Sequence, residues 1–295
     1  MGNAVAVAAR ESGQALAGRH AETDAQVVAM WTHGKAANTA RAYRREALRF
    51  AAFVGAPLPA VTLGDVQAYA DSLAAAGLSV ASQVRALAAV KSLLSFAHTV
   101  GYTPANVGAA EKLPALPLTL AERIVPAETI AALIEGETNP RSRVLLRVLY
   151  YGGLRESEAC GLRWRDVQAR GGGRVQVTVF GKGGKTRAVP LPPHVAEGLT
   201  ALRGDAETDA PVFVGRRGAL SAGQVWRIVK AAGERVGVPA LSPHWLRHAH
   251  ASHALDNGAT PVLVRDTLGH ASLATTSRYM HARPGDSSGL YLPAV

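Results

Sequence analysis

The sequence predicts a mainly α-helical protein of two domains, with a small β-sheet in the second. Helical patterns fill residues 23–110, and they return after residue 126 around a single strand hairpin. Between them, residues 111–126 hold three spaced prolines and no periodicity, which is typical of an interdomain linker. A chain of 295 residues with 48% hydrophobic content can build two cores. We therefore expect a tail at 1–22, a helical domain at 23–110, a linker at 111–126 and a second domain at 127–295.

Three helices are predicted in the first domain. One begins at Thr39 and is expected to turn four side chains inward, namely Tyr43, Leu48, Phe50 and Phe53. A second helix follows Thr62 and Gly64. A third is capped by serines at 79 and 82 and stops at Gly101, because glycine readily ends a helix.

The second domain carries clear helix start and stop signals. Residues 141–164, RSRVLLRVLYYGGLRESEACGLRW, predict a helix, a break at Gly152 and Gly153, and a second helix. Another helix opens at Ser221. Ser242 and Thr260 are each followed by proline, the preferred first helical residue, and Gly258 and Gly269 end the two helices that they start.

The segment 179–191, VFGKGGKTRAVPL, superficially resembles a nucleotide-binding P-loop. That pattern needs a glycine five residues before Gly184, where the chain has Val179, and it needs a following helix. Upstream valines alternate with other residues from 175 to 180, the period of a half-buried strand. We therefore predict a β-hairpin with Lys182 and Lys185 at its tip.

The charge balance points to a polyanionic partner. Lys and Arg number 32 against 22 Asp and Glu, a net charge of +10, which suits nucleic acid or an acidic membrane surface. The sequence has no run of eighteen apolar residues and no signal-peptide pattern at its start, so we expect a cytoplasmic protein without membrane contact. The single cysteine, Cys160, excludes a disulfide framework, and its apolar neighbours favour a packing role.

One predicted helix start gathers groups that suit a phosphate. His244 and Arg247 share a face on its first turns, near the positive end of the helix dipole. Taken singly, such an arginine is usually a phosphate clamp and such a histidine a structural hydrogen bonder. Four histidines, at 244, 248, 250 and 253, also raise a metal site. No carboxylate or cysteine lies at ligand spacing, so we expect no metal.

Four short boxes together resemble the signature of the tyrosine recombinases, the phage integrase and Xer family. They are GGLRESE at 152–158, HWLRH at 244–248, LGH at 268–270 and TSRYMH at 276–281. The resemblance covers about residues 23–285, and Gly152 stands where threonine is common. It implies a helical SAM-like core-binding domain followed by an α+β catalytic domain. It further implies Tyr279 as nucleophile, Glu158 as support for the first arginine, and an active site of Arg155, Lys182, His244, Arg247 and His270.

The activity implied by the resemblance is site-specific DNA recombination through a 3′-phosphotyrosyl intermediate, without a cofactor. Arginines and histidines can stabilise the negative transition state, and the phosphotyrosyl ester conserves the bond energy for rejoining. The implied partners are duplex DNA and further subunits, in a tetramer on two DNA sites with or without a second recombinase. We expect phosphate contacts from basic side chains, namely Arg44, Arg45, Arg85, Lys91 and Lys185. The alternatives are a type IB topoisomerase-like enzyme and a non-catalytic DNA-binding protein.

Overall fold

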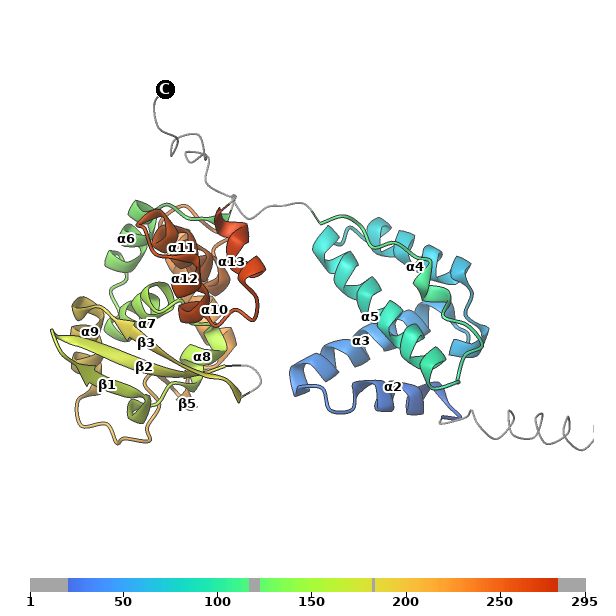
Figure 1. Cartoon of the computed structure of the whole chain (residues 1–295), viewed down its shortest axis with the longest axis horizontal. Helices are drawn as coiled ribbons and strands as arrows, with labels where there is room; N and C mark the ends of the chain where they lie inside the picture. Colours follow the sequence, from blue (N-terminus) through green and yellow to red (C-terminus); the bar gives the residue numbers. More distant parts are fainter. Residues whose placement is uncertain (1–20, 117–122, 182–183, 281–295) are drawn as a thin grey trace, which may run out of the picture. The chain divides into compact units, whose positions relative to one another are not determined.

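The computed structural model describes residues 21–116, 123–181 and 184–280 of the chain (Figure 1). The chain divides into two compact units, Met1–Pro117 and Leu118–Val295. The division falls inside the segment expected to be a linker, and the bounds of the predicted domains stay a prediction. Among the described residues, no helix combines the length and apolar character needed to cross a membrane.

Unit 1 is built from helices within its described part. They are α2 Asp24–Thr32, α3 Ala37–Val54, α4 Leu63–Ala75 and α5 Val80–Thr99, with short 3-10 turns at Leu58–Ala60 and Val107–Ala109. The side chains of Thr23, Thr62 and Ser79 each accept a hydrogen bond from a backbone N–H in the first turn of the helix that follows. The predicted starts at Thr62 and Ser79 are confirmed. The helix predicted from Thr39 begins two residues earlier.

The core of unit 1 is an aromatic and aliphatic cluster between α2, α3, α4 and α5. The rings of Phe50 and Tyr69 meet edge to face at 5.1 Å between centroids. The prediction that Leu48 and Phe53 point inward is wrong, because their exposed fractions are 70% and 45%. The prediction is confirmed for Tyr43 and Phe50, and the inward stripe of α3 continues at the helical period through Ala47 and Val54.

Unit 2 contains helices and two small sheets. Its helices are α6 Ala127–Glu135, α7 Pro140–Tyr151, α8 Glu156–Gly161, α9 Pro193–Arg203, α10 Ala222–Arg235, α11 Pro243–Asp256, α12 Pro261–Leu268 and α13 Leu273–Met280, with a 3-10 turn at Trp164–Asp166. Its strands are β1 Val167–Arg170, β2 Arg174–Phe180, β3 Thr186–Leu191, β4 Val214–Gly215 and β5 Gly218–Ala219. The first three strands form an antiparallel sheet in the order β1-β2-β3, and β4 pairs with β5.

The predicted hairpin is confirmed as β2 and β3. Val175, Val177 and Val179 are buried and Phe180 is exposed, as the alternation predicted. Phe180 pairs with Thr186, and the N–H of Gly181 donates to the carbonyl of Lys185 at 2.7 Å. The third strand, β1, escaped prediction because its four residues are mostly exposed and carry no apolar alternation. Helix α9 packs beside the sheet (Figure 1).

The break and cap signals in unit 2 are also confirmed. Helix α7 ends at Tyr151, and α8 follows after the two glycines. Thr260 caps α12 through the N–H of Leu263, and Gly269 ends it in the left-handed conformation. Ser242 occupies the N-cap position of α11 without a side-chain capping bond. Cys160 is a free, half-buried thiol packed against the core, as expected.

Candidate active site

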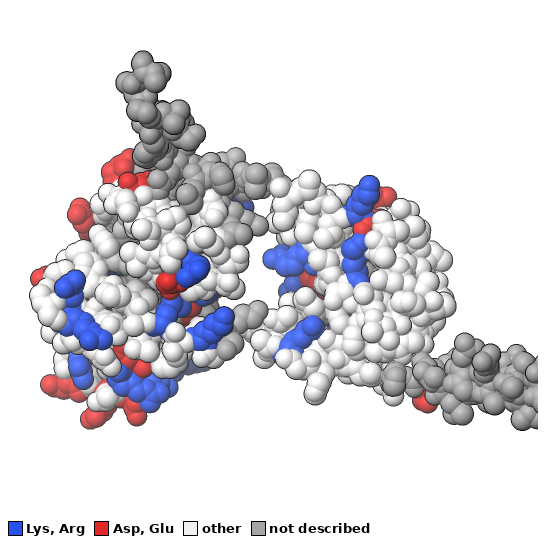
Figure 2. Space-filling view, in the orientation of Figure 1, with Lys and Arg blue, Asp and Glu red and all other residues white. Residues whose placement is uncertain are grey.

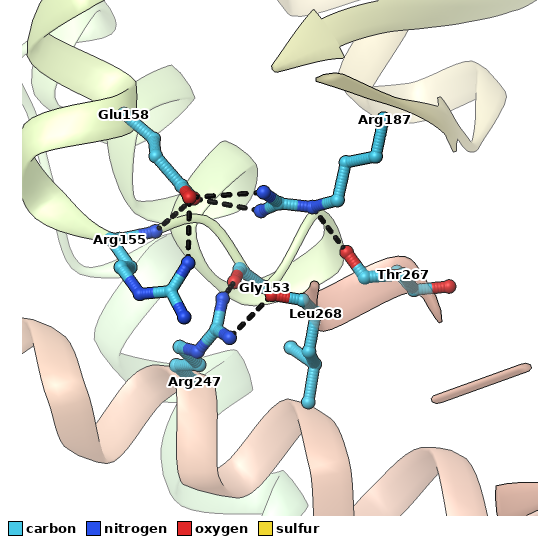
Figure 3. Close-up of polar contacts among 7 residues, drawn as sticks. All are labelled: Gly153, Arg155, Glu158, Arg187, Arg247, Thr267 and Leu268. Atoms are coloured by element: carbon cyan, nitrogen blue, oxygen red, sulfur yellow. Dashed lines mark hydrogen bonds and ion pairs between the residues drawn. The ribbon is translucent and has the colours of Figure 1, made fainter. Parts of the chain in front are cut away.

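A buried carboxylate joins two arginines from segments far apart in the chain (Figure 3). Glu158 on α8 accepts hydrogen bonds from the backbone N–H and the guanidinium of Arg155, each at 2.8 Å. It also accepts two bonds from Arg187 on β3, at 2.9 and 2.7 Å. Burial alone would raise the pKa of Glu158, but the hydrogen bonds from Arg187 and Arg155 outweigh it and hold the pKa below its usual value. The carboxylate therefore stays ionised and fixes both guanidinium groups.

Arg247 is an almost completely buried arginine on the first turns of α11. Its guanidinium donates to the carbonyl oxygens of Gly153 and Leu268, which follow α7 and end α12 (Figure 3). Burial, followed by the charge of Arg155, lowers the pKa of Arg247 to about 10, so it remains a cation near neutral pH. These two bonds fix the orientation of the guanidinium in the DNA-free chain.

The close approach of these segments requires glycine at two positions. Gly153 has a φ of +58°, and a Cβ there would lie 2.4 Å from Cδ2 of Leu268 and 3.1 Å from Cδ2 of His250. Gly269 has a φ of +64°, and a Cβ there would lie 3.2 Å from Nη1 of Arg187. A side chain at either position would strain the backbone and push the arginines' neighbours apart.

A small hollow of about 140 Å³ opens where α8 and α11 begin. Its lining includes one histidine, His244, and two arginines, and the full set is Leu154, Arg155, Glu156, Ser157, Pro243, His244 and Arg247. Burial in the protein, then the charges of Arg247 and Arg155, lower the pKa of His244. Two guanidinium groups, an imidazole and the positive end of a helix together suit an oxyanion such as a phosphate.

His270 lies in the turn between α12 and α13. Its Nδ1 and the hydroxyl of Thr276 are 2.9 Å apart, and the buried Thr276 thereby orients the ring. Burial, then the charges of Arg247 and Arg155, lower the pKa of His270 to about 4. The imidazole is therefore neutral near pH 7, when it can still donate one N–H.

Tyr279 on α13 contacts the histidines of this cluster. Its hydroxyl lies 2.5 Å from Nδ1 of His248 on α11, and its ring lies parallel to that of His270 with centroids 6.4 Å apart. Only 4% of Tyr279 is exposed. The predicted nucleophile is thus covered in the DNA-free chain and contacts the same helix that carries His244 and Arg247.

Five of the six residues predicted for catalysis come together in unit 2: Arg155, His244, Arg247, His270 and Tyr279. Lys182 lies outside the described residues. The neighbouring Gly181 is described, and a Cβ added there would lie 3.9 Å from Oε1 of Glu158. Within the described residues, no group of three His, Cys, Asp or Glu side chains is arranged to hold a metal ion.

Two residues of this cluster were not predicted from sequence as active-site residues. On β3, Arg187 points to the same side as the buried Val189 and Leu191. A cation on that buried side requires a counter-charge, which Glu158 supplies, and this alternation was the signal in the sequence that could have identified Arg187. His248 was considered only as a metal ligand. Its spacing of four from His244 puts both on one side of α11, and their rings lie 4.3 Å apart.

The basic residues predicted to contact DNA differ in their availability. Basic side chains stand out on a mostly uncharged surface in each unit (Figure 2). Arg44, Arg45 and Arg85 are exposed on α3 and α5, and Lys185 is exposed on the hairpin. Lys91 is half-buried and donates to the carbonyl oxygens of Ala109 and Glu111, so its ammonium already has partners within unit 1.

Two known sequence patterns cover most of the chain. The Phage integrase family matches residues 125–285, and the Phage integrase N-terminal SAM-like domain matches residues 30–101. The chain belongs to the phage integrase family. The recognition from the four boxes is confirmed, as is the predicted fold class of a SAM-like helical domain and an α+β catalytic domain. The chain is accordingly a tyrosine-type site-specific DNA recombinase.

The chain is similar to several curated recombinases over most of their length. Tyrosine recombinase XerD of Bifidobacterium longum is 35% identical over 254 residues, which is 79% of this chain and 82% of that protein. Tyrosine recombinase XerC of Rhodospirillum centenum is 36% identical over 268 residues, covering 83% of this chain and 78% of that protein.

Solved structures share the fold at lower identity. The XerH site-specific recombinase bound to its difH substrate superposes with a TM-score of 0.69 at 20% identity, covering 88% of this chain and 82% of that one. A lambda integrase dimer bound to a COC′ core site gives a TM-score of 0.70 at 17% identity, covering 90% of this chain and 79% of that one. These likenesses establish the shared architecture.

Proposed function

We propose that the chain cleaves and rejoins DNA strands through a 3′-phosphotyrosyl intermediate formed on Tyr279. In this proposal Arg155, His244, Arg247 and His270 surround the scissile phosphate, and Glu158 holds the first arginine. The observation that carries the proposal is the convergence of the four sequence boxes. The residue Arg247 is bonded to the carbonyls of two of them, Gly153 and Leu268, and shares a hollow with Arg155 and His244.

The proposed chemistry uses fixed cations and proton transfers. Attack of the Tyr279 oxygen on phosphorus produces a crowded, strongly negative transition state, and arginines held by Glu158 and by carbonyl oxygens offer preorganised donors. The departing 5′ oxygen needs a proton. We assign that role to Lys182. Its neighbour Gly181 supports the assignment, because a Cβ added there would lie 3.9 Å from Oε1 of Glu158.

The proposed partner is duplex DNA, contacted by both units, with the chain acting as a tetramer on two DNA sites alone or with a second recombinase. The net charge of +10 supports this, and the XerH and lambda integrase structures were solved with DNA. The proposed phosphate contacts are Arg44, Arg45, Arg85, Lys91 and Lys185, and the proposed location is the cytoplasm, at the nucleoid. A type IB topoisomerase-like activity is not favoured, because the relatives described above are recombinases. A non-catalytic role is disfavoured because every catalytic position of the family pattern is filled.

A nicked suicide substrate tests the proposal directly. The wild-type chain should yield a covalent protein–DNA adduct that survives denaturation, and Tyr279→Phe should yield none while binding DNA nearly as well. Tyr150→Phe is the matched control, because Tyr150 also hydrogen bonds to a histidine of α11, His253, at 2.8 Å. An adduct of equal yield from Tyr279→Phe would contradict the assignment. A two-site recombination assay run beside a plasmid relaxation assay separates recombination from simple relaxation.

A further inference from the structure

The contact between His248 and Tyr279 has the geometry of a proton transfer. Nδ1 of His248 lies 2.5 Å from the Tyr279 hydroxyl oxygen, and only 8% and 4% of the two residues are exposed. The two helices that carry them, α11 and α13, pack against each other. His248 directly follows Arg247 on α11, and Arg247 lines the hollow of about 140 Å³ described above.

The surroundings of His248 keep its imidazole neutral. The charged and titratable groups that act on it are His244 and Arg247 on α11, Arg123 before α6, and His270 in the turn before α13. Burial first, and then these groups, lower the pKa of His248 to about 4. A neutral imidazole has one nitrogen with a free lone pair, and a phenol at 2.5 Å can donate its hydrogen to that nitrogen.

We propose that His248 is the general base for Tyr279, an inference that rests on the proposed function. During cleavage the phenolic proton moves to Nδ1 of His248 as the Tyr279 oxygen bonds to phosphorus, and the bond from phosphorus to the 5′ oxygen breaks. The 5′ oxygen takes its proton from the general acid. During rejoining the 5′ hydroxyl gives its proton back to the general acid as its oxygen bonds to phosphorus. The bond from phosphorus to the Tyr279 oxygen breaks, and the imidazolium of His248 returns its proton to the departing phenolate.

The chemistry requires such a base. A tyrosine phenol has a pKa of about 10, so only about one molecule in a thousand is ionised near neutral pH. A positioned base typically contributes about 10²- to 10⁴-fold to the rate. The cations around His248 suppress its basicity in the DNA-free chain, and the negative charge of an arriving phosphate offsets them. His248 therefore becomes a stronger base when substrate is bound.

The variant His248→Asn separates proton transfer from positioning. The asparagine amide can still hydrogen bond near the former Nδ1, but it cannot accept a proton. Single-turnover adduct formation on a nicked suicide substrate should fall about 100-fold near neutral pH, with DNA affinity unchanged. The deficit should shrink as the pH rises into the alkaline range, because a tyrosine phenol then ionises without a base. His253→Asn, which alters the other histidine–tyrosine pair on α11, should retain the wild-type rate.

Each other outcome contradicts the proposal in a distinct way. If the rate deficit of His248→Asn stays constant with pH, His248 only positions Tyr279. If His248→Asn reacts as fast as His253→Asn, His248 has no role in cleavage. If His248→Asn reacts faster than wild type, the contact with His248 holds Tyr279 back from attack. Failure of the wild-type chain to form any adduct would instead contradict the proposed function itself.

A measurement on the wild-type protein guards against a folding defect in the variant. In protein labelled with ¹⁵N-histidine, Nδ1 of His248 should be unprotonated near pH 7, and the resonance is assigned by its shift in Tyr279→Phe. A proton on Nδ1 would mean that His248 donates to the phenol oxygen, and this result would overturn the proposal.

Discussion

Replacing Glu158 by glutamine tests whether the ion pairs of Glu158 with Arg155 and Arg187 stabilise unit 2. The carboxylate side chain is 4% exposed, and that of its main partner Arg187 is 12% exposed, so solvent screens this pair weakly. Removing one partner of a buried ion pair typically destabilises by about 3–5 kcal/mol, because the other charge is left uncompensated. Glutamine keeps one acceptor oxygen for the four donated bonds, so we expect the lower end, about 3 kcal/mol.

That free energy converts to a measurable melting shift. For a domain of this size each kcal/mol lowers the melting temperature by about 2–4 °C, which predicts a drop of roughly 6–12 °C. Tryptophan fluorescence reports on the correct unit, because three of the four tryptophans, Trp164, Trp226 and Trp245, belong to unit 2.

The matched control is Glu234→Gln, which removes an exposed carboxylate 3.9 Å from Lys230 one turn away on α10. Such a surface pair contributes about 0.3–0.5 kcal/mol, so the control should melt within about 2 °C of wild type. Equal shifts in the two variants, or a more stable Glu158→Gln, would refute the reasoning.

The loss of stability in Glu158→Gln should depend on pH. The pKa of Glu158 is depressed in the folded chain, so its contribution to stability is complete above the unfolded pKa of about 4.3 and is lost as pH falls through the lower folded value. The gap between wild type and Glu158→Gln should therefore be constant near neutral pH and narrow as the pH falls below the unfolded pKa of about 4.3. A gap that is unchanged in acid would mean that charge is not what glutamine removes.

Three further predictions concern DNA. Arg155→Ala should lower cleavage by about 10²-fold or more with little loss of binding, and equal losses in both would mark Arg155 as a ground-state clamp instead. Lys182→Ala should cleave ordinary DNA poorly but should recover on a substrate with sulfur at the bridging 5′ position, because that sulfur leaves without a proton. Lys185→Ala should change little on either substrate. If sulfur does not restore cleavage, Lys182 is a phosphate contact and not the general acid. The pair of changes Arg44→Gln and Arg45→Gln should reduce the slope of log affinity against log salt by about 0.9 for each phosphate that these arginines neutralise, and an unchanged slope would remove both from the interface.

The sequence predicted the elements whose signals are local. Helix starts at Thr62, Ser79 and Thr260 follow from side chains that cap the next turn, and the hairpin follows from alternating valines. The assignment of Leu48 and Phe53 to the core failed because apolar character alone does not decide which face of α3 meets its neighbours. The position of the inward stripe depends on α4 and α5, which are distant in sequence.

The candidate site divides in the same way. The sequence boxes located Arg155, His244, Arg247, His270 and Tyr279, because the boxes resemble the family signature in their residues and order. They could not reveal that Arg187 shares Glu158 with Arg155, or that His248 contacts Tyr279, since both contacts join segments brought together only by folding. The role of Lys182 likewise stays a prediction.

The two carbonyl bonds of Arg247 restrict when the chain can cut DNA. The guanidinium is oriented only once the turn after α7, the start of α11 and the end of α12 have met, so these segments have no assembled site before unit 2 is complete. A ribosome also delivers Tyr279 after the arginines, so an unfinished chain carries the cations without the proposed nucleophile. If Tyr279 is the nucleophile, a nascent, partly melted or proteolysed copy that binds DNA through its basic charge does not nick it.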